Sequence, residues 1–256
     1  MPAVAQQIVH VGTAGWTIPR RVCDRFASEG TALERYAARF SAAEINSTFY
    51  RAHRPQTFAR WASTVKEGFR FAVKMPKAVT HDCKLVGTAG PLKTFLEETQ
   101  NLGTRLGPFL LQLPPSLAYD GSVAKAFFDL LRACTSHPVV CEPRHPTWFT
   151  EEADAMLVSC AIARVAADPA RVPAAGRPGG LRSLEYYRLH GSPRMYFSEY
   201  APESLSDLAQ TIRKSCAGEV WCVFDNTGSG AAAANALELQ QLLRTAGYGA
   251  NRTGCF

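Results

Sequence analysis

Short apolar runs alternate along the chain with stretches in which apolar residues recur every third or fourth position. The short runs are typical of buried strands and the longer stretches of amphipathic helices. We expect strands at residues 8–12, 43–49, 69–75, 109–113, 139–142, 163–167, 185–190 and 220–224. We expect helices at residues 33–40, 58–65, 91–102, 123–134, 151–160, 204–216 and 234–246, with Thr150 as the N-cap of the fifth. This alternation predicts a parallel sheet built from βα units.

Residues 168–183 break the alternation, because Pro, Gly and Arg are frequent there and no helical period is present. We therefore predict that a loop replaces the sixth helix of a TIM-like (β/α)₈ barrel. A doubly wound open sheet is the rival architecture, but the strand count favours closure and no GxGxxG turn follows the first strand. The absence of a linker or an internal repeat predicts one domain over residues 1–256.

Composition changes this picture little. The chain is 46% hydrophobic and 20% charged, as expected of a globular protein, and its net charge of +6 would attract acidic partners. No basic arm and no nucleic-acid-binding module is present. The sequence has no long apolar run, and because residues 1–7 lack a basic region followed by an apolar stretch, we expect no secretory leader. We expect a cytoplasmic protein with no membrane association, and no protein partner can be inferred.

Metal chemistry is an alternative that the spacing does not favour. The eight cysteines form no CxxC pair, and HxH and HExxH are absent. Carboxylates and histidines do stand at strand ends, at Glu44, Glu142, His145, Asp168, His190 and Asp225. Because basic residues there would compete for the carboxylates, we predict no cofactor, with a divalent metal as the alternative. No GxSxG elbow supports a serine hydrolase.

Strand alternation places an unusually polar set of side chains inside the barrel. If Ile45 and Phe49 face outward, Glu44, Asn46 and Thr48 face inward. Lys74 lies opposite Phe71, Val73 and Met75, and Tyr186, Arg188 and His190 share one face. Since buried charges must be paired, we expect ion pairs such as Glu44 with Lys74 or Glu142 with Arg188. Such pairs can be purely structural, but barrel active sites lie at these strand ends.

Seven segments in order resemble the YecE-like family, the family of domain of unknown function 72. They are GTAGW at 12–16, EINSTFY at 44–50, FAVKMP at 71–76, QLPP at 112–115, EPRH at 142–145, YRLHG at 187–191 and FDNT at 224–227. The resemblance spans nearly the whole chain. It implies a TIM-barrel-like fold and no established reaction.

The same strand ends supply the candidate site. The predicted catalytic residues are Glu142, His190, Glu44 and Lys74, and the predicted ligand-binding residues are Trp16, Asn46, Tyr50, Gln112, Arg144, His145, Arg188, Asp225, Asn226 and Gly228. Glu142 and His190 are acid–base candidates, and Arg144 and Arg188 are candidates for binding an anion. The glycine-rich turn at 225–230 precedes a helix and is a candidate phosphate site, or else an ordinary helix cap.

The leading hypothesis is an enzyme, such as a hydrolase or lyase, that acts on a phosphate-bearing ligand, either a nucleotide or a nucleic acid. One alternative is a noncatalytic nucleic-acid-binding protein that uses the same mouth, with aromatic side chains stacking on bases. A second alternative is a sugar isomerase or lyase, which would bind its ligand without a phosphate group. The fold does not decide between them.

Overall fold

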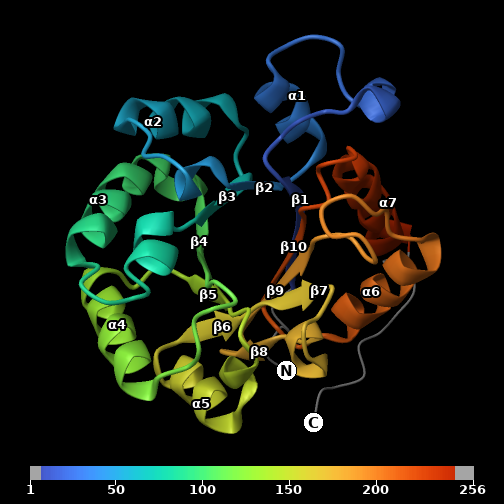
Figure 1. The fold of residues 1–256 in the computed structure, drawn as a ribbon. Coiled ribbons are helices and arrows are strands. Elements are labelled where there is room, and N and C mark those ends of the chain that lie inside the picture. Colours follow the sequence, from blue (N-terminus) through green and yellow to red (C-terminus); the bar gives the residue numbers. More distant parts are fainter. Residues whose placement is uncertain (1–6, 246–256) are drawn as a thin grey trace, which may run out of the picture.

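The computed structural model describes residues 7–245, which form a nearly closed, mostly parallel barrel ringed by helices (Figure 1). The strands are β1 Ile8–Ala14, β2 Ala42–Ile45, β3 Arg70–Lys74, β4 Leu106–Gln112, β5 Val139–Glu142, β6 Ile162–Arg164, β7 Ala166–Asp168, β8 Gly179–Gly180, β9 Leu184–Leu189 and β10 Glu219–Phe224. The helices are α1 Ala32–Arg39, α2 Pro55–Thr64, α3 Ala89–Thr99, α4 Gly121–Cys134, α5 Glu151–Ser159, α6 Pro202–Lys214 and α7 Ala231–Thr245. The βα alternation predicted from the sequence is confirmed.

The barrel closes through the run that we expected as one strand at 163–167. This run is two short strands, β6 and β7, separated by Val165. β6 pairs with β5 and β7 pairs with β9, both in parallel. The rest of the ring runs from β9 through β10, β1, β2, β3 and β4 to β5. The TIM-like prediction is therefore confirmed over an open doubly wound sheet.

The helices begin where the local sequence supplies caps. Thr31 and Glu34 form a capping box at α1, and Asp120 accepts hydrogen bonds from two backbone N–H groups at the start of α4. The hydroxyl of Thr150 accepts a hydrogen bond from the Ala153 N–H, which confirms the predicted N-cap of α5. The buried faces of these helices pack against the outer side of the strands and form the main core.

The end of the second strand differs from the one expected. The second strand ends at Ile45 rather than at residue 49, and the chain continues as a 3₁₀ turn over Ser47–Phe49. The inward placement predicted for Thr48 by strand alternation is therefore wrong. Its hydroxyl donates to the carbonyls of Ile45 and Lys74, which closes the turn over the end of β3.

The sixth helix is absent, as predicted. Between β7 and β9 the described chain contains a 3₁₀ turn, Pro173–Gly176, and the two-residue strand β8, which pairs antiparallel with β6. The outer face of β7 and β9 is thus covered by this 3₁₀ turn and by α6 in place of a full helix. Along residues 7–245, moreover, we find no helix with the length and apolar character needed to cross a membrane.

The barrel interior is layered. Alternate residues of the strands form a small apolar cluster, which includes Ala42, Ala72, Leu110, Val140, Tyr186, Trp221 and Val223. The next inward position lies two residues further along each strand, at or just after its carboxyl end. That position is polar in almost every strand, and there the apolar filling gives way to charge.

Candidate functional site

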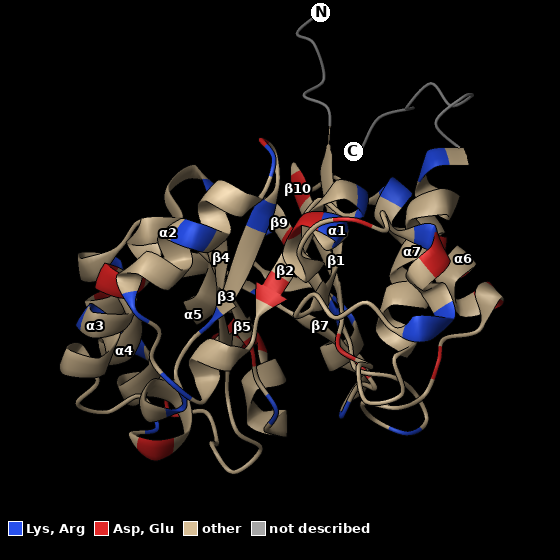
Figure 2. Ribbon diagram, turned by 90° about the horizontal axis from the view of Figure 1, so that it is seen from above, with Lys and Arg blue, Asp and Glu red and all other residues tan. Residues whose placement is uncertain are grey.

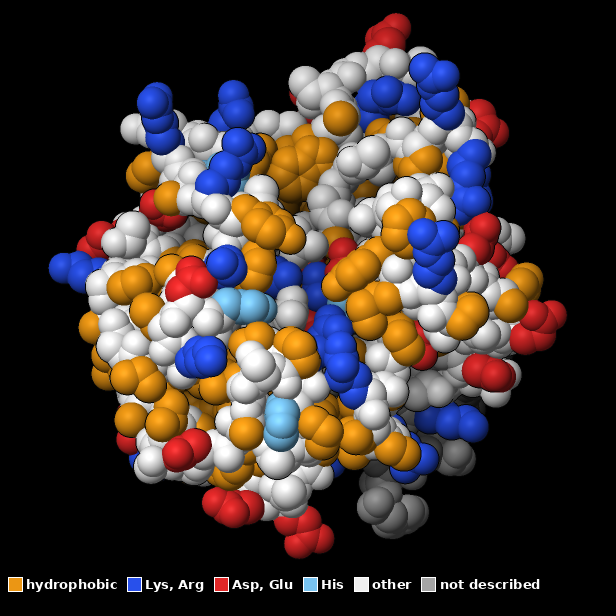
Figure 3. Space-filling view, in the orientation of Figure 1, with side chains coloured by type: hydrophobic (Ala, Val, Ile, Leu, Met, Phe, Trp, Pro, Cys, Tyr) orange, Lys and Arg blue, Asp and Glu red, His pale blue; other side chains and the backbone are white. Residues whose placement is uncertain are grey.

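The inward side chains at the carboxyl ends of the strands form a layer of charged groups. They are Glu44 on β2, Lys74 on β3, Glu142 on β5, Arg188 on β9 and Asp225 just after β10, and all five are buried. Figure 2 shows the strands running in a common direction, with an acidic position at the tip of β2. Figure 3 looks onto this end of the barrel and shows Lys, Arg and His side chains near the centre of the face.

Arg188 is the hub of this layer, and only 1% of its surface is exposed. Its Nη2 lies 2.7 Å from Glu44 Oε1 and 3.0 Å from Asp225 Oδ2, and its Nη1 lies 3.0 Å from Glu142 Oε2. The Tyr186 hydroxyl donates to the other oxygen of Glu44, at 2.8 Å. The three carboxylates hold the pKa of Arg188 well above its ordinary value despite burial.

The observed pairs correct one of the two predicted ones. The Glu142–Arg188 pair is confirmed, but the Glu44–Lys74 pair is wrong, because Glu44 is held by Arg188 and Tyr186. Arginine presents a planar fork of donors that can reach several carboxylates at once, whereas the lysine ammonium is a single point. The longer, forked side chain of Arg188 therefore pairs with Glu44 and Glu142.

His190 follows β9 and lies between two carboxylates. Its Nδ1 is 3.0 Å from Asp225 Oδ2 and its Nε2 is 3.0 Å from Glu142 Oε1. Arg144 Nη2 is 2.5 Å from the same Glu142 oxygen and 2.9 Å from His190 Nε2. Arg188 and Arg144 hold the pKa of Glu142 well below its ordinary value, against the opposing effect of burial. Glu142 is thus a charged anchor whose oxygens are both engaged.

Lys74 stands apart from these pairs. Its Nζ lies 4.2 Å from the centre of the Phe49 ring, a cation–π contact. Within residues 7–245 the Lys74 ammonium group forms no hydrogen bond and no ion pair. Burial, with a smaller contribution from Arg188, lowers the pKa of Lys74 to about 8, although Glu44, Glu142 and Asp225 act in the opposite direction. Lys74 is therefore a desolvated amine that can exchange a proton near neutral pH.

Arg144 also keeps an unused donor. Its Nη2 is bound to Glu142, but its Nε is buried and has no hydrogen-bond partner within the described part of the chain. A buried donor without an acceptor costs about 1 to 3 kcal/mol. Arg144 and Lys74 are buried side chains that keep 7% and 8% of their surface exposed.

Several predicted ligand-binding residues lie outside the layer of charged groups. The Trp16 ring packs edge-on against Trp61 of α2, on the helix side of the barrel wall. Tyr50 is 80% exposed and contacts Phe49, and His145 accepts a hydrogen bond from the Thr147 N–H in a surface turn. Gln112 is half-buried at the end of β4. The nearest predicted neighbour of this layer is Asn46, whose Oδ1 is 3.4 Å from Arg188 Nη2.

The glycine-rich turn after β10 holds a neighbouring loop in place. The amide of Asn226 donates to the Ser198 carbonyl at 2.9 Å, and the Gly228 N–H donates to the Tyr196 carbonyl at 2.9 Å. A Cβ on Gly228 would lie 2.9 Å from that same carbonyl oxygen and 3.1 Å from the Phe197 ring. Close packing accounts for the glycine, and the Gly228 N–H is engaged by the Tyr196 carbonyl.

Two aromatic contributions to the mouth were not among the predicted site residues. The Lys74 ammonium lies over the Phe49 ring, and the Tyr196 ring lies edge-on to His190 with ring centres 5.7 Å apart. Tyr196 has a left-handed backbone with φ +69°, and its N–H donates to the His190 carbonyl. The available signal was their position beside polar motif residues, which does not distinguish packing from binding.

The carboxylates here are poorly placed for a metal. Glu44, Glu142 and Asp225 each contact Arg188, and within residues 7–245 no group of three His, Cys, Asp or Glu side chains is arranged to hold an ion.

Sequence and structure comparisons place this barrel among known proteins. Residues 10–253 match a family model described as "Protein of unknown function DUF72". The chain belongs to the DUF72 family. Over 145 residues it is 30% identical to the UPF0759 protein YecE of Escherichia coli strain K12, a match that covers 56% of this chain. The chain spans about half the length of the curated relatives that it matches, since 51% of YecE is covered.

Solved DUF72 structures show the same fold. A DUF72 family protein from Thermotoga maritima MSB8 superposes with a TM-score of 0.77 at 24% identity, covering 93% of this chain and 99% of that one. A DUF72 family protein from Enterococcus faecalis V583 gives a TM-score of 0.78 at 21% identity, covering 92% and 95%. The resemblance stated from the seven sequence motifs is confirmed, and these DUF72 comparisons name no activity.

Proposed function

We propose that this DUF72 protein is an enzyme that binds a phosphate-bearing ligand at the carboxyl end of its barrel. The observation that carries the proposal is the unequal satisfaction of charges there. The carboxylates of Glu44, Glu142 and Asp225 are all engaged by Arg188, whereas Lys74 Nζ and Arg144 Nε have no acceptor among the described residues. An incoming anion would supply the missing acceptor.

This arrangement reassigns two of the roles expected from the sequence. Arg188 is almost completely buried and its donors are committed, so Arg144 is the better candidate for contact with the anion. Because its pKa is strongly lowered, Glu142 stays ionised at neutral pH and is a poor general acid or base there. Lys74, with a pKa of about 8, is better matched to proton transfer near neutrality. His190 and Asp225 then act as positioning residues for Glu142 and Arg144.

A thermal-shift screen with wild type, Arg144→Ala and Arg39→Ala tests the ligand class. Arg39 is exposed at the end of α1, which leads into the opposite end of β2, and provides the matched control. The probes are ribose 5-phosphate, inorganic phosphate, ribose and a short single-stranded oligonucleotide. A ligand at 100 times its Kd stabilises the folded state by about 2.7 kcal/mol. We expect stabilisation by ribose 5-phosphate in wild type and Arg39→Ala, and its loss in Arg144→Ala.

Stabilisation by ribose alone would favour the sugar isomerase or lyase and contradict the proposal. Equal stabilisation of Arg144→Ala by the phosphate compounds would place their binding elsewhere. Catalysis is then tested with Lys74→Arg, which keeps the charge but removes the readily lost proton. The proposal expects ligand binding to be retained and turnover to be lost in this variant.

The exposed aromatic rim favours one second candidate, the noncatalytic nucleic-acid-binding protein. Tyr50, Tyr196 and Phe197 are 80%, 43% and 42% exposed, and the Arg194 guanidinium lies 4.2 Å from the Phe197 ring centre. Such rings can stack on unpaired bases. This candidate predicts oligonucleotide binding that weakens steeply with salt and is reduced by Phe197→Ala, whereas Lys74→Arg should leave it unchanged.

A further inference from the structure

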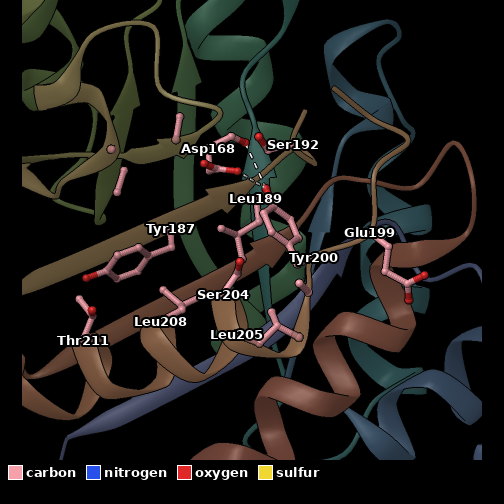
Figure 4. A pocket seen from close by; sticks show the side chains of 14 residues that line it. Asp168, Tyr187, Leu189, Ser192, Glu199, Tyr200, Ser204, Leu205, Leu208 and Thr211 are labelled. Carbon is pink, nitrogen blue, oxygen red and sulfur yellow. Dashed lines mark hydrogen bonds between the residues drawn. The ribbon is translucent and has the colours of Figure 1, made fainter. Parts of the chain in front are cut away.

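A cavity of about 450 Å³ lies on the outside of the barrel wall, where the sixth helix is missing (Figure 4). It runs between the outer faces of β7 and β9 and the side of α6. Its lining residues include Asp168, Tyr187, Leu189, Ser192, Leu205 and Leu208. This volume is within the range of about 300 to 1,000 Å³ found for small-molecule sites. The cavity is separate from the charged layer inside the barrel.

The long walls of this cavity are apolar. Leu189 and Tyr187 of β9 form one side, and Leu205 and Leu208 of α6 form the other (Figure 4). The Tyr187 hydroxyl donates to Glu185 at 2.9 Å, so this polar group already has a partner outside the lining. The middle of the cavity therefore favours an aromatic or aliphatic group over a sugar or a phosphate.

One end of the cavity carries a carboxylate that has no cation. Asp168 is half-buried at the end of β7, and its Oδ2 accepts a hydrogen bond of 2.6 Å from the Tyr200 hydroxyl. The same hydroxyl accepts from the Gly191 N–H at 2.9 Å, which fixes the tyrosine in place. No Lys, Arg or His nitrogen of residues 7–245 lies within 4.0 Å of the Asp168 carboxylate.

The other acid lining the cavity is in a different state. Glu199 makes a paired contact with Arg21, with donor–acceptor distances of 3.0 and 3.1 Å, and stands apart from Asp168 in Figure 4. A partly desolvated carboxylate with only a neutral donor gains most from a positively charged partner. In a chain of net charge +6, this cavity thus offers an uncompensated negative charge at its end.

We propose that this cavity is a binding site for an organic cation, a primary ammonium compound with an aromatic or aliphatic body. The ammonium group contacts Asp168, and the apolar body lies between β9 and α6. The Ser192 side chain, near Asp168 in Figure 4, is placed to accept a further hydrogen bond from the ammonium group. This site is independent of the phosphate-bearing ligand proposed for the barrel mouth.

Calorimetric titration with phenethylamine tests the proposal, with 2-phenylethanol and 3-phenylpropionate as neutral and anionic probes of similar shape. We expect the amine to bind more tightly than the alcohol and the carboxylate not to bind. Asp168→Asn preserves the shape and can still accept from Tyr200, and it should weaken amine binding about tenfold or more. Glu199→Gln is the matched control and should leave the amine affinity unchanged.

Equal affinity of Asp168→Asn and wild type for phenethylamine would overturn the proposal, as would equal binding of the alcohol or no binding of the amine at millimolar concentration. A thermal unfolding curve for each variant checks that it is folded. Arg144→Ala should bind phenethylamine like wild type. A failure of the proposal at the barrel mouth therefore remains distinguishable from a failure here.

Discussion

Replacing Lys74 by Met should stabilise the protein at neutral pH. Burial lowers the pKa of Lys74 from 10.5 to about 8, so the folded protein holds this proton less well than the unfolded chain does. At 1.36 kcal/mol per pKa unit, the charged lysine costs about 3 kcal/mol of folding free energy. Methionine removes the charge, and with it the contact of the ammonium group with the Phe49 ring, but keeps an unbranched apolar side chain at this position. We expect a gain of about 2 to 3 kcal/mol at pH 7.

The sign of the pH dependence gives a second check. Because the folded pKa is the lower one, the penalty is fully present below about pH 8 and is relieved as the pH rises from there towards 10.5. Urea unfolding of wild type and Lys74→Met at pH 7 and pH 10 measures it. We expect the advantage of the variant to shrink by more than half at pH 10.

Lys77 offers the matched control, because it is exposed and pairs with Asp82 on the surface. Lys77→Met should change stability by less than about 0.5 kcal/mol at either pH. A Lys74→Met protein that is destabilised at pH 7 would refute the reasoning, since it would mean that Lys74 neutralises a carboxylate that needs it. A stabilisation that does not change with pH would contradict the proposed cause.

The remaining predictions concern the anchors of the charged layer and one helix end. Arg188→Met should destabilise by about 4 kcal/mol or more in urea unfolding, because Glu44 and Glu142 lose their buried cation; a near-neutral effect would show that the pairs are dispensable. Because its folded pKa is depressed, Glu142 contributes stability that is present above about pH 4.5 and is lost as the pH falls further, so the free energy of unfolding of Glu142→Gln should vary less than that of wild type between pH 5 and pH 3. Thr150→Ala should cost about 1 kcal/mol in thermal or urea unfolding through the lost bond to the Ala153 N–H, and an unchanged midpoint would argue against that cap.

Most of the fold could be predicted because buried parallel strands leave a plain signal, the short apolar run. The expected strand at 43–49 shows where this signal fails. Its alternation of apolar and polar residues continues through Asn46 and Thr48 to Phe49, yet the chain turns after Ile45. A 3₁₀ turn with alternating apolar and polar residues resembles a strand in sequence. Only tertiary hydrogen bonds, such as that from the Thr48 hydroxyl to the Lys74 carbonyl, distinguish the turn from a strand.

The candidate site was predictable as a location but not as a set of roles. Alternation places Glu44, Lys74, Glu142 and Arg188 on the inward face, and the structure brings all four to one end of the barrel. The alternation does not predict which carboxylate each cation reaches, since that depends on side-chain length and donor geometry across the barrel. The cavity beside Asp168 could have been inferred from the missing helix, but its unpaired carboxylate could not.

The most direct test of the central claim is an NMR titration of the Lys74 side chain, with Lys74→Met used to assign its signal. We expect a pKa of about 8 for the free protein, because Lys74 is desolvated and has no hydrogen-bond or ion-pair partner within residues 7–245. We also expect a rise in that pKa when ribose 5-phosphate binds, since an anion beside the ammonium favours its charged form. A value close to 10.5 that the ligand does not move would show that Lys74 is neither desolvated nor in contact with the anion.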